Sequence, residues 1–290
     1  MHSFENPTQI IEALDRNQYI AEEEFATALF LLLRLRKPLL VEGPPGVGKT
    51  EIAPVLADLL DTELIRLQCY EGLDVNAAVY EWNYQKQLLG IRLQENSGLS
   101  IEEKEKHIFG DDYLLERPLL RSILAESKPP VLLIDELDRS DEEFEAFLLE
   151  LLSAFQISIP EMGTIKAKHK PFVILTSNRT RELSDALKRR CLYHWIDYPD
   201  LEKEMRIVKK HLPDIEENLL HQIVNEVQKL RQHKLLKTPG VSETIDWAES
   251  LLALGYRDLN TVAFDNTIGC ILKSADDIIQ IRKERADIMS

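Results

Sequence analysis

The chain has 290 residues, of which 44% are hydrophobic, so it can form one large or two modest domains. Its 50 acidic residues outnumber 35 basic ones and give a formal net charge of -15. An acidic surface repels phosphate backbones and anionic lipid, so nonspecific binding to nucleic acid or to a membrane surface is disfavoured.

The cysteines and the N-terminal stretch indicate a cytoplasmic protein. The three cysteines lie far apart and form no C-x-x-C, so the sequence indicates neither a disulfide framework nor a zinc site. Residues 1–16 lack the basic and apolar segments of a secretory signal. The longest apolar run, Ala28 to Leu33, is too short to span a bilayer.

The first 200 residues predict strands that alternate with helices. A helix over 21–35 leads into a short apolar strand at 39–42, and a second helix is expected over 49–60. Polar residues 96–112 predict a loop, and 156–168 predict a hairpin. The remaining expected elements are strands at 63–70, 129–136 and 171–178, and helices at 117–127 and 140–155, the last with a capping box of Ser140 and Glu143. Residues 79–85 alternate like a strand, whereas 85–93 are compatible with a helix, and the two readings stay open.

Helical periods dominate from Leu201 onwards, and they change the expected architecture. The expected helices span 201–211, 214–233, 243–254 and about 259–285, with Ser242 capping the third and Gly255 closing it. The sequence therefore predicts an α/β fold with a doubly wound parallel-sheet core over residues 1–200. A C-terminal all-helical lid domain follows over residues 201–290.

Residues 43–50 place three glycines and two prolines between an expected strand and an expected helix. They fit G-x-x-x-x-G-K-[ST], the P-loop pattern, in which backbone N–H groups surround phosphate oxygens. Lys49 is expected to reach the β- and γ-phosphates, and the Thr50 hydroxyl to ligate Mg²⁺. A glycine-rich turn that carries a lysine for other reasons is disfavoured, because strand, spacing, Lys-Thr pair and helix all agree. The predicted phosphate-binding residues are Gly43, Pro44, Pro45, Gly46, Val47, Gly48, Lys49 and Thr50.

A second motif, formed by two acidic residues, follows the apolar run of residues 131–134. Asp135 and Glu136 stand at the carboxyl end of this expected strand, which faces the ligand crevice in a doubly wound sheet. Asp135 is expected to hold Mg²⁺ through water, and Glu136 to orient and polarise the attacking water. A role as a helix cap fits Asp138 or Ser140 better than it fits this pair.

With both motifs in place, the chain resembles the AAA+ ATPases. The resemblance implies that Asn178, after the strand ending in Thr-Ser, acts as the first sensor that helps position the lytic water. It also implies an arginine finger in residues 183–191, with Arg190 as the first candidate and Arg189 as the second. Without the two motifs, Asn178 would be read as a strand-end turn residue and the arginines as a solvated basic stretch.

Within AAA+, the chain is similar to the MoxR group, through "LLVEGPPGVGKTE", "LLIDELDR", the hairpin before "FVILTSN", and "LSDALKRRCLYHWIDYP". "YEGLD", "VYEWNYQKQLLGIR" and "PGVSETIDWA" further resemble the carbon-monoxide-dehydrogenase accessory ATPases of that group. The resemblance implies ATP and Mg²⁺ as cofactors, a hexameric ring, and a protein partner with a von Willebrand factor A domain. It also implies maturation or remodelling of a target, such as a metal-cofactor enzyme.

The sequence departs from many family members in the lid. Where they carry a second-sensor arginine, the stretch 240–247 offers Glu243 and Thr244 and no arginine. No second sensor is therefore assigned.

Three other functions remain open beside Mg²⁺-dependent ATP hydrolysis coupled to remodelling of a protein. A P-loop small-molecule kinase would need an acceptor pocket, whereas Glu136 suits attack by water. A nucleotide-gated scaffold would not need Glu136. A DNA-acting AAA+ loader conflicts with the acidic balance of the chain.

Overall fold

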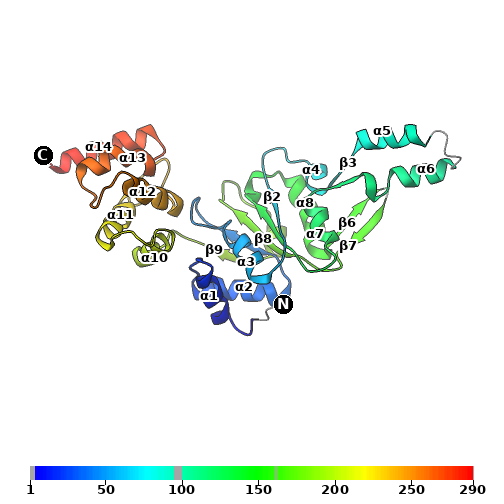
Figure 1. Cartoon of the computed structure of the whole chain (residues 1–290), viewed down its shortest axis with the longest axis horizontal. Helices are drawn as coiled ribbons and strands as arrows, with labels where there is room; N and C mark the ends of the chain where they lie inside the picture. The colour runs from blue at the N-terminus through cyan, green and yellow to red at the C-terminus, as the bar shows by residue number, and fades with distance from the viewer. Residues whose placement is uncertain (1–3, 95–99, 161, 290) are drawn as a thin grey trace. The chain divides into compact units, whose positions relative to one another are not determined.

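The computed structural model describes residues 4–94, 100–160 and 162–289 (Figure 1). The chain divides into two compact units. The first contains Met1–Ile10, Glu23–Glu42 and Thr50–His194, and the second contains Ile11–Glu22, Gly43–Lys49 and Trp195–Ser290. The domain limits expected at residues 200 and 201 stay a prediction.

A five-stranded sheet forms the centre of the first unit, in the order β2-β5-β8-β1-β9. The pairings of β2 with β5, β5 with β8 and β8 with β1 are all parallel, which confirms the doubly wound α/β core. The three inner strands are buried along their whole length, as expected for apolar strands covered on both faces. The strands are β1 (Leu39–Glu42), β2 (Leu64–Gln68), β5 (Val131–Asp135), β8 (Phe172–Ser177) and β9 (Leu192–Trp195).

Beside this sheet the chain forms helices and two small antiparallel strand pairs, and several of these elements lie where the sequence predicts them. The antiparallel pair β6–β7 confirms the hairpin expected over 156–168. The helices are α1 (Pro7–Arg16), α2 (Glu23–Leu35), α3 (Ile52–Leu60), α4 (Val75–Val79), α5 (Tyr84–Leu93), α6 (Ile101–Ile108), η1 (Asp111–Tyr113), α7 (Pro118–Leu124), η2 (Leu137–Arg139), α8 (Glu142–Ala154) and α9 (Asp185–Lys188). The strands of the two antiparallel pairs are β3 (Tyr80–Trp82) with β4 (Leu114–Glu116), and β6 (Gln156–Ile159) with β7 (Gly163–Lys166).

The loop expected over 96–112 is wrong for residues 101–108, which form α6; residues 95–99 lie outside the described part. The helix begins with a reciprocal capping box. The Glu103 N–H donates to Ser100 Oγ at 3.2 Å, and the Ser100 N–H donates to Glu103 Oε2 at 2.9 Å. The S-x-x-E signal was present in the sequence, but the polar composition concealed it.

Two expected helix caps are also wrong. The N-cap of α8 is Asp141, whose carboxylate accepts from the Phe144 N–H at 2.8 Å, while Ser140 Oγ donates to the Leu137 carbonyl. The N-cap of α12 is Gly240 and not Ser242, because the helix begins two residues earlier than its apolar period indicates.

The second unit includes five helices around one apolar core that contains Trp247 and Phe264. The C-terminus of α12 closes at Gly255 as expected, with φ at 77°. The single helix expected over 259–285 is wrong: Leu272 turns extended and buries its side chain, which separates two helices. The helices are α10 (Leu201–His211), α11 (Glu217–Leu230), α12 (Val241–Ala253), α13 (Thr261–Ile271) and α14 (Ala275–Met289).

Within the described residues, no helix combines the length and the apolar character that crossing a membrane requires.

Candidate nucleotide site

The glycine-rich loop follows β1 and precedes α3, as the sequence predicts, and its backbone conformation requires glycine. Gly46 and Gly48 have φ values of 75° and 88°, a region that other residues rarely adopt. At Gly43 a Cβ atom would lie 2.0 Å from the carbonyl oxygen of Ile196. At its glycines the loop therefore presents backbone without side chains. Backbone N–H groups of this kind are the donors that bind phosphate oxygens.

Lys49 lies against the carbonyl oxygens of its own loop. Its Nζ donates to the carbonyl oxygens of Gly43, at 2.8 Å, and of Pro44, at 2.6 Å. Only 6% of the residue is exposed. The ammonium group is thus held at the loop rather than extended into solvent.

The structure joins Thr50 to the acidic end of β5, 85 residues away in sequence. Thr50 Oγ1 donates to Asp135 Oδ1 at 2.9 Å, and Thr176 Oγ1, from β8, donates to the same oxygen at 2.6 Å. The Asp135 carboxylate is buried, so these hydroxyls fix its orientation. A threonine hydroxyl beside a carboxylate supplies the hard oxygen ligands that Mg²⁺ takes, so the predicted pair fits that ion.

Glu136 turns away from the strand that carries it. Its φ and ψ are 52° and 49°, a left-handed conformation that is costly for a residue with a side chain. The Glu136 N–H donates to Thr176 Oγ1 at 2.9 Å, which helps to hold this turn. Glu136 Oε2 lies 3.0 Å from Arg139 Nε, and the Glu136 side chain is 34% exposed. The two adjacent carboxylates therefore have different surroundings: Asp135 is buried and Glu136 is partly exposed.

Asn178 stands directly after β8, and its backbone is anchored by a buried carboxylate. Asp138 accepts from the Asn178 N–H at 3.1 Å, and from the Thr180 N–H and Oγ1 at 2.9 and 2.6 Å. Burial raises the pKa of Asp138, but the hydrogen bonds from Thr180 and Asn178 outweigh it and hold the pKa below its usual value. Asp138 therefore fixes the backbone of the loop that carries Asn178.

Arg190 lies on the surface of the first unit, just beyond α9. Its Nε donates to Ser153 Oγ at 2.8 Å, and its Nη1 donates to the Ala186 carbonyl at 2.9 Å. Both partners belong to α8 and α9, so the structure does not bring Arg190 into the cluster around Asp135. Arg189, the second candidate, is also exposed.

In the second unit, the start of α12 contacts the glycine-rich loop through backbone atoms. The Val241 N–H donates to the Gly46 carbonyl at 2.8 Å. Thr244 is buried, and its Oγ1 donates to Glu204 Oε1 at 2.7 Å. Arg231 forms a bidentate pair with the same Glu204 at 2.6 and 2.7 Å. The Thr244 hydroxyl and the Arg231 guanidinium are therefore both bound to the buried Glu204 carboxylate.

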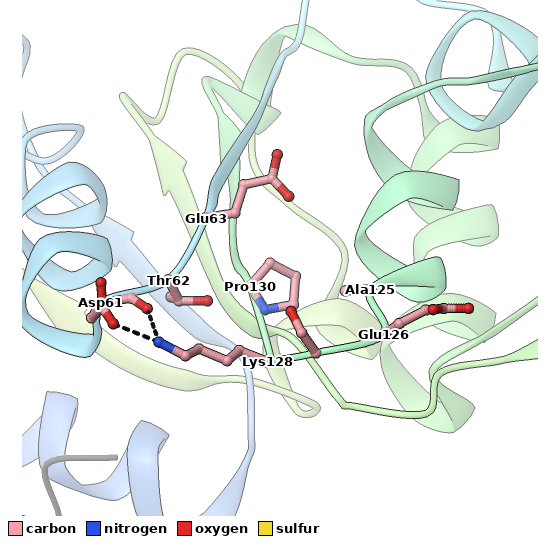
Figure 2. A pocket seen from close by; sticks show the side chains of 8 residues that line it. Asp61, Thr62, Glu63, Ala125, Glu126, Lys128 and Pro130 are labelled. Carbon is pink, nitrogen blue, oxygen red and sulfur yellow. Dashed lines mark hydrogen bonds and ion pairs between the residues drawn. The ribbon is translucent and has the colours of Figure 1, made fainter.

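A hollow of about 420 Å³ lies at the opposite, amino end of β2 and β5 (Figure 2). Lys128 reaches across it, and its Nζ donates to Asp61 Oδ2 at 2.5 Å. The residues of the candidate site stand at the carboxyl ends of the strands, so this hollow is separate from it. Its lining residues are Asp61, Thr62, Glu63, Ala125, Glu126, Ser127, Lys128 and Pro130.

Sequence reasoning missed three residues of this site. Thr176 connects Asp135 to the Glu136 backbone, Asp138 anchors the loop of Asn178, and Arg66 pairs with Asp135. The polar Thr-Ser pair at the end of an otherwise apolar strand was a usable signal for Thr176. No local pattern connects Arg66 to Asp135, because the pair depends on how β2 and β5 align.

Comparison with known proteins gives one matching family model and many similar folds. Residues 39–196, more than half of the chain, match the model of the ATPase family associated with various cellular activities (AAA). An uncharacterized protein of Staphylococcus aureus is 26% identical over 229 residues, which cover 77% of this chain and 78% of that protein. One from Staphylococcus epidermidis is 26% identical over 259 residues, which cover 87% and 88%.

Among solved structures, two mutants of the Thermotoga maritima RuvB protein are similar to this chain, with TM-scores of 0.52 and 0.51. Each is 20% identical in sequence. The matches cover 87% and 88% of this chain and 70% of each RuvB chain. At this identity the likeness supports the fold alone.

Proposed function

Because the chain belongs to the AAA family of ATPases, we propose that it couples ATP hydrolysis to the remodelling or maturation of a protein partner, as a MoxR-type member. The chain is an ATPase that uses ATP with Mg²⁺. The observation that carries the proposal is the hydrogen-bonded cluster of Thr50, Asp135 and Thr176, which joins the phosphate-binding loop to the acidic strand.

Each residue of the site has a proposed role that follows from its position. Residues 43–48 cradle the phosphates through their backbone N–H groups, and Lys49 exchanges its loop carbonyls for the β- and γ-phosphates. Thr50 and Asp135 would hold Mg²⁺, the latter through water. When Mg²⁺ is bound, it supplies positive charge that offsets the negative charge developing on the phosphates.

Two further side chains act on the attacking water in this proposal. Glu136 polarises it, since its carboxylate is partly exposed whereas that of Asp135 is buried. Asn178 positions it from the adjacent strand end, with its backbone held by Asp138.

The assembly and the partner are also part of the proposal. AAA ATPases commonly form hexameric rings, and Arg190, exposed at the surface of its unit, serves a neighbouring site in such a ring. The partner carries a von Willebrand factor A domain, and the remodelled target includes a metal-cofactor enzyme. The core and the helical lid divide near residue 200, and the protein acts in the cytoplasm.

Nucleotide-dependent capture of a purified von Willebrand factor A partner tests the coupling. A Glu136→Gln variant loaded with ATP is expected to retain the partner, because ATP stays bound when hydrolysis is blocked. Lys49→Ala, which loses the main positive charge on the β/γ-phosphates, is the matched control and should not retain it. Co-elution in size-exclusion chromatography measures the complex. Equal retention by both variants would argue against nucleotide coupling, and ATP-dependent phosphorylation of a small molecule would favour the kinase.

Thr176→Val should reduce ATP hydrolysis by roughly 10–100-fold, the usual cost of losing a group that orients a metal ligand. The change removes the hydroxyl that bonds both Asp135 and the Glu136 backbone. It leaves the Glu136 N–H without this acceptor and Asp135 Oδ1 with the Thr50 hydroxyl alone of the two that orient it. Thr176→Ser keeps the hydroxyl and serves as the control. Steady-state phosphate release at saturating ATP gives the comparison. Equal rates in the valine and serine variants would show that Thr176 only fills space.

A further inference from the structure

The magnesium site of the proposed function contains a basic residue that no motif identifies. Arg66 lies on the edge strand β2, whose Gln68 is in register with Asp135 of β5. Arg66 and Gln68 share a face of β2, while Ile65 and Leu67 between and beside them are buried. This placement sends the Arg66 side chain along the strand toward its carboxyl end.

Arg66 binds the oxygen of Asp135 that the two threonines leave open. Its Nη2 lies 2.6 Å from Asp135 Oδ2, whereas both hydroxyls bind Oδ1. Gln68 Oε1 accepts from the same Nη2 at 2.6 Å. A buried carboxylate without a cation is costly, so the ion pair with Arg66 offsets part of the cost of burying Asp135.

The pair is uneven in exposure, and this decides which partner can leave. The Arg66 side chain is 54% exposed, against 3% for Asp135. The guanidinium can return to water at little cost, whereas the carboxylate cannot. Arg66 is therefore the exchangeable partner.

The surroundings of Asp135 are strongly acidic, which favours a second cation there. Glu136 follows Asp135 directly in the chain, and the buried Asp138 stands three residues beyond Asp135. A hydrated dication beside Asp135 would face the Arg66 guanidinium at short range, and like charges repel. The Arg66 guanidinium and a dication therefore weaken each other's binding to Asp135.

We propose that Arg66 is a built-in counter-ion of the magnesium site, which competes with the divalent cation for Asp135 and so lowers its affinity. The inference rests on the proposed role of Asp135. It predicts that displacement of Arg66 from Asp135, and not the number of ligands alone, sets the Mg²⁺ concentration at which the site fills. By linkage, metal binding must also weaken the contact between Arg66 and Asp135.

Binding of Mn²⁺ to the full chain with ADP, followed by electron paramagnetic resonance of the free ion, tests the inference without relying on hydrolysis. Arg66→Gln should bind Mn²⁺ about tenfold more tightly, a change that corresponds to about 1.4 kcal/mol. Arg66→Lys keeps the charge and should stay close to wild type. Arg121→Gln is the matched control, because Arg121 is 57% exposed and pairs with Glu63, which lines the hollow at the other end of the strands.

Thermal unfolding gives a second readout. Without metal, Arg66→Gln should melt below wild type, because Asp135 has lost a counter-ion, and Mn²⁺ with ADP should raise its melting temperature by more than in wild type. If that variant does not fold, Gln68→Ala should tighten Mn²⁺ binding in the same direction, since it removes the acceptor that orients the guanidinium.

Unchanged or weaker Mn²⁺ binding by Arg66→Gln would overturn the competition. Loss of metal-free ADP binding in that variant would overturn it too, because Arg66 would then contact the phosphates. If wild-type protein with ADP bound no Mn²⁺, the magnesium site itself would fail along with this inference.

Discussion

Arg190→Ala is expected to lower ATP hydrolysis by roughly 10³-fold or more while ATP binding stays intact. Phosphoryl transfer spreads negative charge over the γ-phosphoryl oxygens, and an arginine directed at that charge can be worth about 10³–10⁵ in rate. Arg190 is exposed and bound to Ser153 and to the Ala186 carbonyl, on the surface of its own unit. In the proposed ring, Arg190 would act at the site of a neighbouring subunit. Phosphate release and binding of a fluorescent ATP analogue separate the two effects.

Mixed oligomers provide the sharpest version of this experiment. Lys49→Ala subunits keep Arg190, and Arg190→Ala subunits keep the phosphate-binding loop. A working site can therefore form only where the two kinds of subunit meet. The mixture should regain activity that neither variant has alone. Mixed rings that form and stay inactive would count against a finger acting between subunits.

Two further variants separate a catalytic effect of Arg190 from a structural one. Arg189→Ala removes an adjacent exposed arginine and should hydrolyse ATP far faster than Arg190→Ala. Ser153→Ala removes the hydrogen bond that orients the Arg190 side chain in this structure but keeps the charge. If Arg189→Ala shows the larger loss, the second candidate is the finger.

Glu136→Gln is expected to bind ATP normally and to hydrolyse it at least about a hundredfold more slowly, the scale of lost general-base help. The amide keeps the shape of the side chain, and the backbone hydrogen bond to Thr176 that holds the turn is unaffected. The variant should therefore fold like wild type, and melting curves can check this. Single-turnover measurements with pre-bound ATP give the rate of the chemical step.

Arg139→Gln is the control for the ion pair of Glu136. If Arg139 only pairs with Glu136 at the surface, its loss should change the rate far less than the loss of the carboxylate does. A Glu136→Gln variant with wild-type turnover would mean that another residue activates the water.

The local parts of this structure could be predicted because short segments of sequence encode them. The strand, loop and helix around residues 43–50 depend on glycine at positive φ and on the apolar run before it. The hairpin of β6 and β7 and the C-terminus of α12 at Gly255 depend on similarly local signals. Helix starts were less predictable, since Asp141, Ser140 and other capping residues stand side by side and only one can bond the first N–H groups.

The sequence by itself therefore determined the AAA-type core, the glycine-rich loop between β1 and α3, and the acidic pair at the end of β5. Each of these comes from residues that are neighbours in the chain, so composition and spacing suffice to specify them. The tertiary structure alone decided the contacts of Asp135 with Thr50, Thr176 and Arg66, which are 41 to 85 residues away. These contacts depend on the strand order β2-β5-β8-β1-β9 and its register, because a shift of one residue would turn every side chain to the other face.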